Sequence, residues 1–145
     1  VLSTNINPFL KQVSRTPHAN FLNLKLVSAE STAVTLLMPY SDNIIGDPYN
    51  KVVHSGAITT LIDTACGAAI FQAQNNTQAM ATLDLRVDYV SPAAAGKNIQ
   101  AYADCYKLTS TIAFVRTTVF TDDINTPIAT ATATFMRSNK SFSIN

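Results

Sequence analysis

Asp63 is the only residue with a formal charge between Lys51 and Asp84, and it lies within an apolar segment, residues 55–74. Removing an ionised carboxylate from water costs several kcal/mol unless neighbouring groups pair with it or donate hydrogen bonds. A carboxylate kept in such surroundings can serve as a general base. The alternative is a structural Asp bonded to a backbone amide or a hydroxyl. We favour the functional interpretation.

The residues that lead into this segment could stabilise negative charge. His54, Ser55 and Gly56 directly precede the apolar run, and the first backbone N–H groups of a helix have no partner within the helix. Aimed at a carbonyl oxygen, such N–H groups form an oxyanion hole. The alternative is that Ser55 is a simple N-cap and that Gly56 relieves crowding.

The spacing of Ser55 and Asp63 limits how they could cooperate. They are eight residues apart, which is about 12 Å along a helix. Groups that act on one reacting centre must lie within about 3–3.5 Å of the atoms they serve. If both residues act, Asp63 of one copy must face the Ser55 amide of another, which predicts two antiparallel helices across a two-fold axis.

Residues 55–74 contain no proline and are long enough for about five turns of helix. Large apolar residues recur on one side with helical spacing. The other side is small and weakly polar rather than charged, so we expect protein to enclose the helix on most of its circumference. The apolar side holds Ile58, Leu61, Ile62, Ala65 and Ala69, and the small side holds Thr59, Thr60, Cys66 and Gly67.

The rest of the chain favours strands, because Thr, Ile and Val make up more than a quarter of it and these side chains suit pleated surfaces. We expect a hairpin of strands at 21–27 and 32–38, followed after the helix by four strands in a meander. Those four are predicted at 79–90, 98–107, 111–120 and 126–137.

The strand at 79–90 alternates between apolar and polar residues, which is typical of a half-buried strand. Leu83, Leu85 and Tyr89 fall on one predicted face, and Thr82 and Asp84 fall on the other.

Three further segments complete the predicted order. An N-terminal helical segment is expected within residues 1–17, with a short helix over 5–14 that begins at Asn5 or Asn7 and ends at Pro17. Residues 40–53, which include Gly46 and Pro48, are expected to form a long loop, and such loops are often functional. The polar residues 138–145 are expected to fray.

The composition excludes several classes of function. The net charge is +1 and Lys and Arg are scattered, so nucleic acid is not an expected partner. No apolar run approaches the ~20 residues that span a bilayer, and no signal peptide is evident, so we expect a cytoplasmic protein without membrane partners. Two cysteines and no His/Cys cluster predict neither a disulfide framework nor a metal site. The length fits a single domain over 1–145.

One combination of residues matches a known family. Residues 54–56 (HSG), Asp63 nine positions after the His, and residues 89–93 (YVSPA) together resemble the hotdog-fold acyl-CoA thioesterases of the phenylacetic-acid-degradation type. The resemblance covers residues 44–136. It implies an α+β hotdog fold, in which a long central helix is wrapped by a curled antiparallel sheet of about six strands. It also implies active sites between subunits of a homodimer or a dimer of dimers.

The resemblance implies a role for each matching residue in hydrolysing an acyl-CoA thioester to free acid and coenzyme A. Asp63 matches the residue that acts as general base on water or as nucleophile. Ser55 matches a glycine whose N–H polarises the thioester carbonyl. Thr82 matches a hydroxyl that orients the water in some members, and His54 matches a structural or positioning histidine.

The substrate is expected to contact small residues of the helix. The acyl chain would lie in an apolar tunnel beside Thr59, Thr60, Cys66 and Gly67, with Gly56 close to the thioester. Coenzyme A enters only as part of the substrate, and no further cofactor or metal is implied. Cys66 itself has no basic neighbour in sequence that would lower its pKa, so we interpret it as a small buried side chain and not as a nucleophile.

Two positions depart from the family pattern. Ser55 replaces a glycine, and Pro48 stands where many members carry Asn, six residues before the His. A non-catalytic acyl-CoA-binding module is therefore an alternative. A hydratase or dehydratase acting on enoyl or 3-hydroxyacyl thioesters is a weaker one, because the sequence shows no local pairing of a His with an acid.

Overall fold

The computed structural model describes residues 6–141. Its N-terminal half holds η1 (Pro8–Arg15), α1 (Pro17–Phe21), β1 (Lys25–Ala29), β2 (Ala33–Met38), η2 (Asp42–Ile44), β3 (Ile45–Asp47) and β4 (Val52–Val53). The long helix α2 (Ser55–Gln74) follows, and then β5 (Gln78–Tyr89), β6 (Ile99–Leu108), β7 (Ile112–Phe120) and β8 (Ala129–Ser141).

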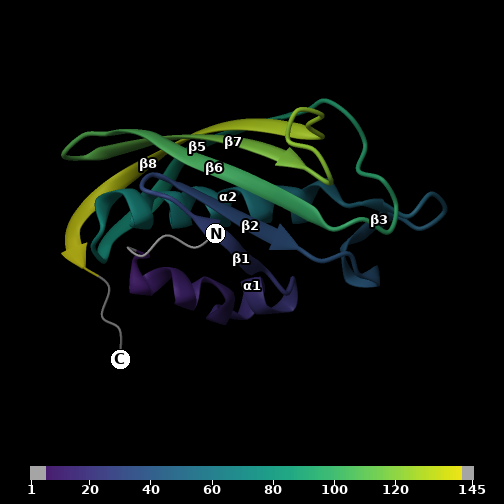
Figure 1. The fold of residues 1–145 in the computed structure, drawn as a ribbon, viewed down its shortest axis with the longest axis horizontal. Helices are drawn as coiled ribbons and strands as arrows, with labels where there is room; N and C mark the ends of the chain where they lie inside the picture. Colours follow the sequence, from purple (N-terminus) through teal and green to yellow (C-terminus); the bar gives the residue numbers. More distant parts are fainter. Residues whose placement is uncertain (1–5, 142–145) are drawn as a thin grey trace.

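Six strands form one antiparallel sheet in the order β1-β2-β6-β7-β8-β5. The sheet arches over α2, and the N-terminal helical segment lies on the other side of that helix (Figure 1). The expected α+β hotdog arrangement, with a long helix wrapped by a curled six-stranded sheet, is confirmed.

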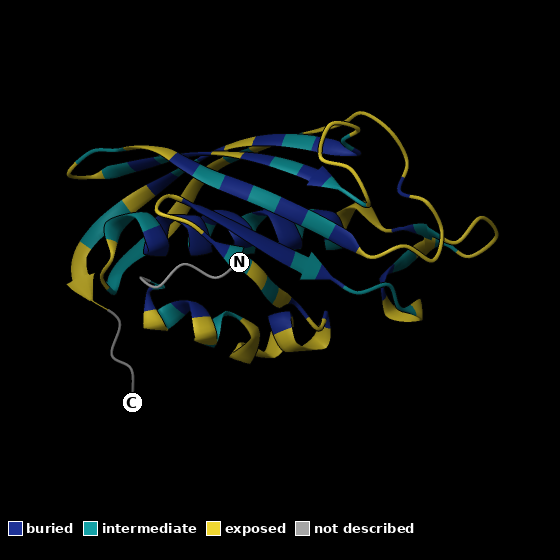
Figure 2. Ribbon diagram, viewed as in Figure 1, coloured by how far each residue is buried: buried dark blue, intermediate teal, exposed yellow. Residues whose placement is uncertain are grey.

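The close packing of α2 on the sheet depends on small side chains. Strands β2, β6 and β7 pack against α2, and the buried residues of β6 include Ala101 and Ala103. These alanines leave room for the large side chains of the helix, among them Leu61, Ile62 and Ile70, which are fully buried. Figure 2 shows the resulting alternation of buried and half-buried residues along β6.

The expected limits of α2 are confirmed at both ends. The hairpin of β1 and β2 is also confirmed, but β1 begins at Lys25 and not at residue 21. Phe21 belongs to α1, and the chain turns at Asn23, whose φ is 54°. Pro17 does not end the helical segment, because it begins α1 after Thr16 caps that helix.

The expected four-strand meander is wrong in one connection. Strands β6, β7 and β8 are consecutive neighbours, but β5 pairs with β8 at the far edge of the sheet. Residues 90–98 carry the chain from that edge back to β6, which pairs with β2.

Both ends of the chain differ from expectation. The N-terminal helix is a 3-10 helix capped by the side chain of Asn7, which accepts a hydrogen bond from the Phe9 amide. Asn5, the alternative cap, lies outside the described residues. Strand β8 continues to Ser141, where Gln78 of β5 pairs with it, so the expected fraying from residue 138 is wrong for 138–141. Residues 142–145 lie outside the description.

The expected loop at 40–53 contains a small hairpin. Asp47 Oδ1 accepts hydrogen bonds from the amides of Tyr49 and Asn50, and its Oδ2 accepts one from Asn50 Nδ2. These bonds close the turn between β3 and β4. The hairpin leads into His54, whose amide donates to the Ile44 carbonyl at 2.7 Å.

Among the described residues, α2 is long and apolar enough, by length and composition alone, to cross a membrane. The sequence expectation that no run approaches this length is corrected accordingly. Core helices pass the same test, and α2 forms the core of this fold.

Alanine substitutions at Gly46 and Gly67 should have opposite effects on the free energy of unfolding. A Cβ on Gly46 would lie 2.8 Å from His54 Cα, whereas a Cβ on Gly67 would meet nothing within 4 Å. We expect Gly46→Ala to lower the free energy of unfolding by about 1–3 kcal/mol through overpacking. We expect Gly67→Ala to raise it by up to about 1 kcal/mol through helix propensity. Urea denaturation checks both, and equal effects of the two variants would contradict the described packing.

Candidate active site

Asp63 lies near the middle of α2 and is half-buried. The hydroxyl of Thr82, on the edge strand β5, donates a hydrogen bond to Asp63 Oδ1 at 2.8 Å. The structure therefore brings together two of the predicted site residues. Because the Thr82 hydroxyl donates its one proton to the carboxylate, its oxygen stays available to accept a hydrogen bond from water.

A β-bulge explains how Thr82 reaches the helix. The predicted alternation placed Thr82 on the face opposite Leu83 and Leu85. The pairing with β8 shifts between Thr82 and Asp84, so Thr82 bonds to α2 while Leu85 also packs against the core. Leu83 is 57% exposed. The prediction that Leu83 and Leu85 share one face is wrong, because a bulge reverses the alternation.

His54, and not Ser55, is the N-cap of α2. Its Nδ1 accepts a hydrogen bond from the Gly56 amide at 2.8 Å, so a neutral ring carries its proton on Nε2. The His54 carbonyl accepts from the Ala57 amide at 3.0 Å. The Ser55 amide has no hydrogen-bond partner within residues 6–141, and it is thus open to a ligand.

Tyr89 ties the end of β5 to the start of α2. Its hydroxyl donates to the Ser55 carbonyl at 2.9 Å and lies 2.8 Å from Thr59 Oγ1. Thr59 Oγ1 also lies 3.1 Å from the same carbonyl. Sequence reasoning treated Tyr89 as part of an apolar face and missed this role. The available signal was its place as the first residue of the YVSPA motif.

Thr60 is half-buried on α2, one turn after Gly56. Its hydroxyl donates to the Gly56 carbonyl at 3.1 Å and is 3.4 Å from His18 Nε2. Both histidines of the chain line one hollow of about 180 Å³ with Thr60, Gly56 and Asn43. Sequence reasoning did not place His18 here, because α1 and α2 come together only through tertiary packing.

The expectation that protein encloses α2 on most of its circumference holds except along one side of the helix. Ser55 and Gly56 are exposed, and Thr59, Thr60, Asp63, Thr64 and Gly67 are half-buried. The sheet covers one side of α2, and η1 covers part of another. A stripe of small and polar residues remains open between them.

Cys66 does not belong to this open stripe. It is fully buried, and its sulfur lies 3.2 Å from Thr117 Oγ1 on β7. Burial raises the pKa of the Cys66 thiol to about 12, so it stays a thiol at neutral pH. The interpretation as a small buried side chain is confirmed, and the grouping of Cys66 with Thr59, Thr60 and Gly67 beside a tunnel is wrong.

Ser55 and Asp63 do not meet within one chain. Helix α2 is continuous between them, so they stay about 12 Å apart along its axis. Ser55 borders a hollow of about 410 Å³ that Tyr89 and Pro92 also line. Gly67 borders another, of about 430 Å³, with Thr64 and η1.

Comparison with known proteins places this geometry in a family. Residues 50–128, more than half of the chain, match the family model described as the thioesterase superfamily. The chain belongs to the thioesterase superfamily. By this membership it is a thioester hydrolase, and the resemblance inferred from the HSG, Asp63 and YVSPA pattern is confirmed.

Individual relatives of this superfamily chain agree in length and fold. The medium/long-chain acyl-CoA thioesterase YigI of Salmonella typhimurium is 26% identical over 133 residues, which cover 83% of this chain and 84% of that protein. A solved structure from Pseudomonas aeruginosa is 39% identical, covers 90% of this chain and 100% of its own, and has a TM-score of 0.80. A mutant form of the phenylacetic acid degradation protein PaaI of Thermus thermophilus is 23% identical and covers 85% of this chain and 100% of its own. Its TM-score of 0.74 shows a shared fold.

Pro48, where the resemblance predicts an Asn, lies in a turn of this thioesterase. Pro48 occupies the turn that Asp47 and Asn50 close, so the side-chain amide of Asn50 is engaged there. Asn43 instead lines the hollow beside His54. Among the described residues, no group of three or more His, Cys, Asp or Glu side chains could hold a metal ion.

The histidines are not paired with an acid in the described part of the thioesterase. His54 contacts the Gly56 amide, and His18 contacts Thr60.

Replacing Tyr89 with Phe should loosen the start of α2. The variant loses the hydroxyl that joins Ser55 and Thr59, and we expect a loss of about 1 kcal/mol in the free energy of unfolding. Tyr49→Phe is the matched control, because Tyr49 is 93% exposed and should change stability by less than ~0.5 kcal/mol. Equal stability of the two variants in urea denaturation would contradict the proposed tie.

The raised pKa of Cys66 predicts a pH-dependent stability. An unfolded thiol loses its proton near pH 9.0, and the folded one near 12, so the folded state holds the extra proton between these values. The stabilisation is complete below pH 9 and is lost toward pH 12, at about 1.4 kcal/mol per pH unit. We therefore expect the stability gap between wild type and Cys66→Ala to narrow as pH rises from 9.

Cys105→Ala provides the comparison for this pH series. Burial raises the pKa of Cys105 to about 11. The difference in stability between wild type and Cys105→Ala should therefore narrow over a shorter pH range. A Cys66→Ala gap that stays constant from pH 8 to 11.5 would show that the thiol titrates alike in the folded and unfolded chains.

Proposed function

We propose that this chain hydrolyses acyl-CoA thioesters to a free acid and coenzyme A, with Asp63 as the general base. The observation that carries the proposal is the hydrogen bond from Thr82 to Asp63 on the open side of α2. The superfamily supports thioester hydrolysis, and the name of the Salmonella relative supports an acyl-CoA substrate.

The proposed reaction needs only groups of the chain, water and the substrate. Water donates one hydrogen bond to Asp63 and a second to the Thr82 oxygen. As the water oxygen bonds to the thioester carbon, its proton passes to Asp63. The oxyanion that forms accepts a hydrogen bond from a Ser55 amide at the positive end of the α2 dipole. The carbon–sulfur bond then breaks, and Asp63 returns the proton to the thiolate of coenzyme A.

His54 is a positioning residue in this scheme. By accepting from the Gly56 amide, it fixes the peptide group that joins Ser55 and Gly56. The Ser55 N–H belongs to the preceding peptide group, whose oxygen, the His54 carbonyl, accepts from the Ala57 amide, so the cap residue fixes that group as well. No cofactor or metal besides the coenzyme A of the substrate takes part in the proposed steps.

We infer that the complete site forms between two copies of the chain. Within one chain Ser55 and Asp63 stay two turns apart, with Ser55 exposed and Asp63 half-buried on the open side of α2. Strand β5 pairs with β8 on one side only, among the described strands, and a long unpaired edge is a template for pairing. Pairing of β5 with its copy would bring two α2 helices together antiparallel, with Asp63 of each facing Ser55 of the other. A dimer of such dimers is a further proposal.

A cytoplasmic location is also a proposal. Cys66 and Cys105 are both free and buried, which fits a reducing compartment.

Replacing Asp63 with Asn tests the proposed mechanism. Asn keeps the size of the side chain and an oxygen that accepts from Thr82, but it is not a base. We expect kcat for acyl-CoA hydrolysis to fall by at least ~10² while the far-UV circular dichroism stays unchanged. Asp84→Asn, at an exposed carboxylate of β5, is the matched control and should retain activity.

Two outcomes would overturn the proposal. Unchanged thiol release by Asp63→Asn across short, medium, long and aryl acyl-CoAs would exclude Asp63 as the base. Calorimetric binding of acyl-CoA to the wild-type chain without any release of thiol would identify a non-catalytic binding module.

A further inference from the structure

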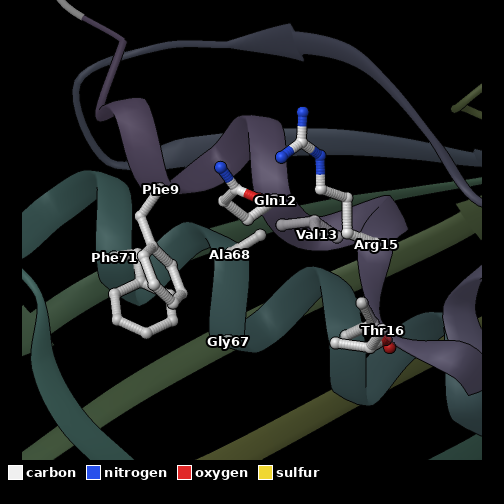
Figure 3. Close-up of a pocket in the computed structure, with 9 residues that line it drawn as sticks. Phe9, Gln12, Val13, Arg15, Thr16, Gly67, Ala68 and Phe71 are labelled. Carbon is white, nitrogen blue, oxygen red and sulfur yellow. The ribbon is translucent and has the colours of Figure 1, made fainter. Parts of the chain in front are cut away.

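The pocket of about 430 Å³ lies between η1 and α2. Figure 3 shows the side chains that line it, with η1 above and α2 below. Its lining is mainly apolar: Phe9 and Val13 come from η1, and Gly67, Ala68 and Phe71 come from α2. We call this space the η1 pocket.

The η1 pocket begins beside Asp63. Thr64, the next residue, lines it, and Gly67 lies one turn further along α2. Residues four apart on a helix lie on the same face. The pocket therefore continues the open stripe that carries the carboxylate.

Gly67 gives the pocket its entrance from the helix side. A Cβ at this position would meet nothing within 4 Å, so the missing side chain leaves open space. Any larger residue here would project into that space between Asp63 and the far end of the pocket.

The far end is closed by two aromatic rings. The ring centroids of Phe9 and Phe71 are 4.4 Å apart, with the planes at 46°. Phe71 is eight residues after Asp63, or about 12 Å along the helix. An extended polypeptide advances about 3.3–3.6 Å over the three backbone bonds of each residue. An alkyl chain has similar bond lengths and angles and advances about as far over three bonds, so this length accommodates about ten carbon atoms.

The charge of the lining also favours an apolar ligand. Arg15 is the one charged residue among those that line the pocket, and it is exposed. Figure 3 shows its guanidinium turned away from Gly67 and Ala68. The interior between the two helices offers methyl and aromatic groups.

From these observations we propose that the η1 pocket holds the acyl chain of the substrate and that residues 8–16 limit its length, which makes unbranched medium-chain acyl-CoAs the preferred substrates. This inference rests on the proposed function. The pocket wall formed by η1 lies outside residues 50–128, the part of the chain that matches the family model, so this limit on chain length rests on residues that the model does not include.

Two variants from the opposite walls test the proposal. Gly67→Leu fills the pocket from α2, and Val13→Phe fills it from η1. The measurement is kcat/KM for acetyl-, hexanoyl-, decanoyl- and myristoyl-CoA by thiol release. One methylene in an apolar pocket is worth about 10–200-fold in specificity. We expect wild type to prefer decanoyl-CoA and each variant to lower the decanoyl-to-acetyl ratio at least ~10-fold.

The control is Thr132→Leu, which adds the same side chain at an exposed position of β8 and should leave the ratio unchanged. Because either pocket variant could fold poorly, circular dichroism selects those that keep the wild-type spectrum. Size-exclusion chromatography measures the oligomeric state of each variant, which changes if a second copy of the chain packs against the pocket.

The outcomes separate this inference from the proposed function. A folded variant that hydrolyses both substrates with an unchanged decanoyl-to-acetyl ratio would overturn the proposal that the η1 pocket holds the acyl chain. A variant that changes only the oligomeric state would overturn it as well. Neither result would contradict the proposed hydrolase activity. If wild type releases no thiol from any substrate, the proposed function fails. Calorimetry of decanoyl- against acetyl-CoA then decides: a selective loss of decanoyl-CoA binding in both variants supports the pocket, and equal binding overturns it.

Discussion

The sheet can cover only one side of α2, and this constraint organises the molecule. The helix is apolar over most of its length and carries a single charge, Asp63. Its large side chains pack against β2, β6 and β7, where small residues on β6 allow a close approach. The opposite side is left to the N-terminal helices, which cover it in part. Asp63 lies in the gap between the sheet and the N-terminal helices, where it is half-buried and accepts a hydrogen bond from Thr82.

The edge strand β5 serves both ends of the candidate site. It runs back along α2, so that Thr82 reaches Asp63 and Tyr89 reaches Ser55. A strand with regular alternation would not present both hydroxyls to the helix, since they are seven residues apart and successive side chains alternate between faces. The bulge after Thr82 shifts the alternation by one residue. One local irregularity therefore holds Asp63 and the start of α2 against the same strand.

Much of the fold could be predicted from the sequence because it depends on periodicity. The limits of α2 follow from an apolar run free of proline, and the hairpin of β1 and β2 follows from two β-rich runs with a short polar connection. The partner of β5 could not be predicted, because alternation shows that a strand is half-buried but not which strand lies beside it. The continuation of β8 to Ser141 was missed for the same reason, since the pairing of Ser141 with Gln78 of β5 cannot be read from a polar sequence.

Local rules singled out Asp63, Ser55, Thr82 and His54 as candidate site residues, and a motif connected them. Cys66 was assigned to the open side of α2 because it is small, although helix geometry turns it toward Thr117. Tyr89 was missed because its ring fits an apolar face and its hydroxyl finds Ser55 only in the folded chain. The wall formed by η1 was also beyond sequence reasoning, since residues 8–16 show no sign of contact with residues 64–71.

That wall has an evolutionary consequence. The groups proposed to break the thioester bond lie within or close to the family core, whereas half of the lining of the η1 pocket comes from a short stretch near the start of the chain. Substitutions at its lining positions Phe9 and Val13 change the pocket without replacing Asp63, Thr82 or the cap at His54, whereas Leu10 of the same stretch is buried in the core. Duplicated copies of this chain could therefore diverge in the acids they release while their chemistry is inherited unchanged.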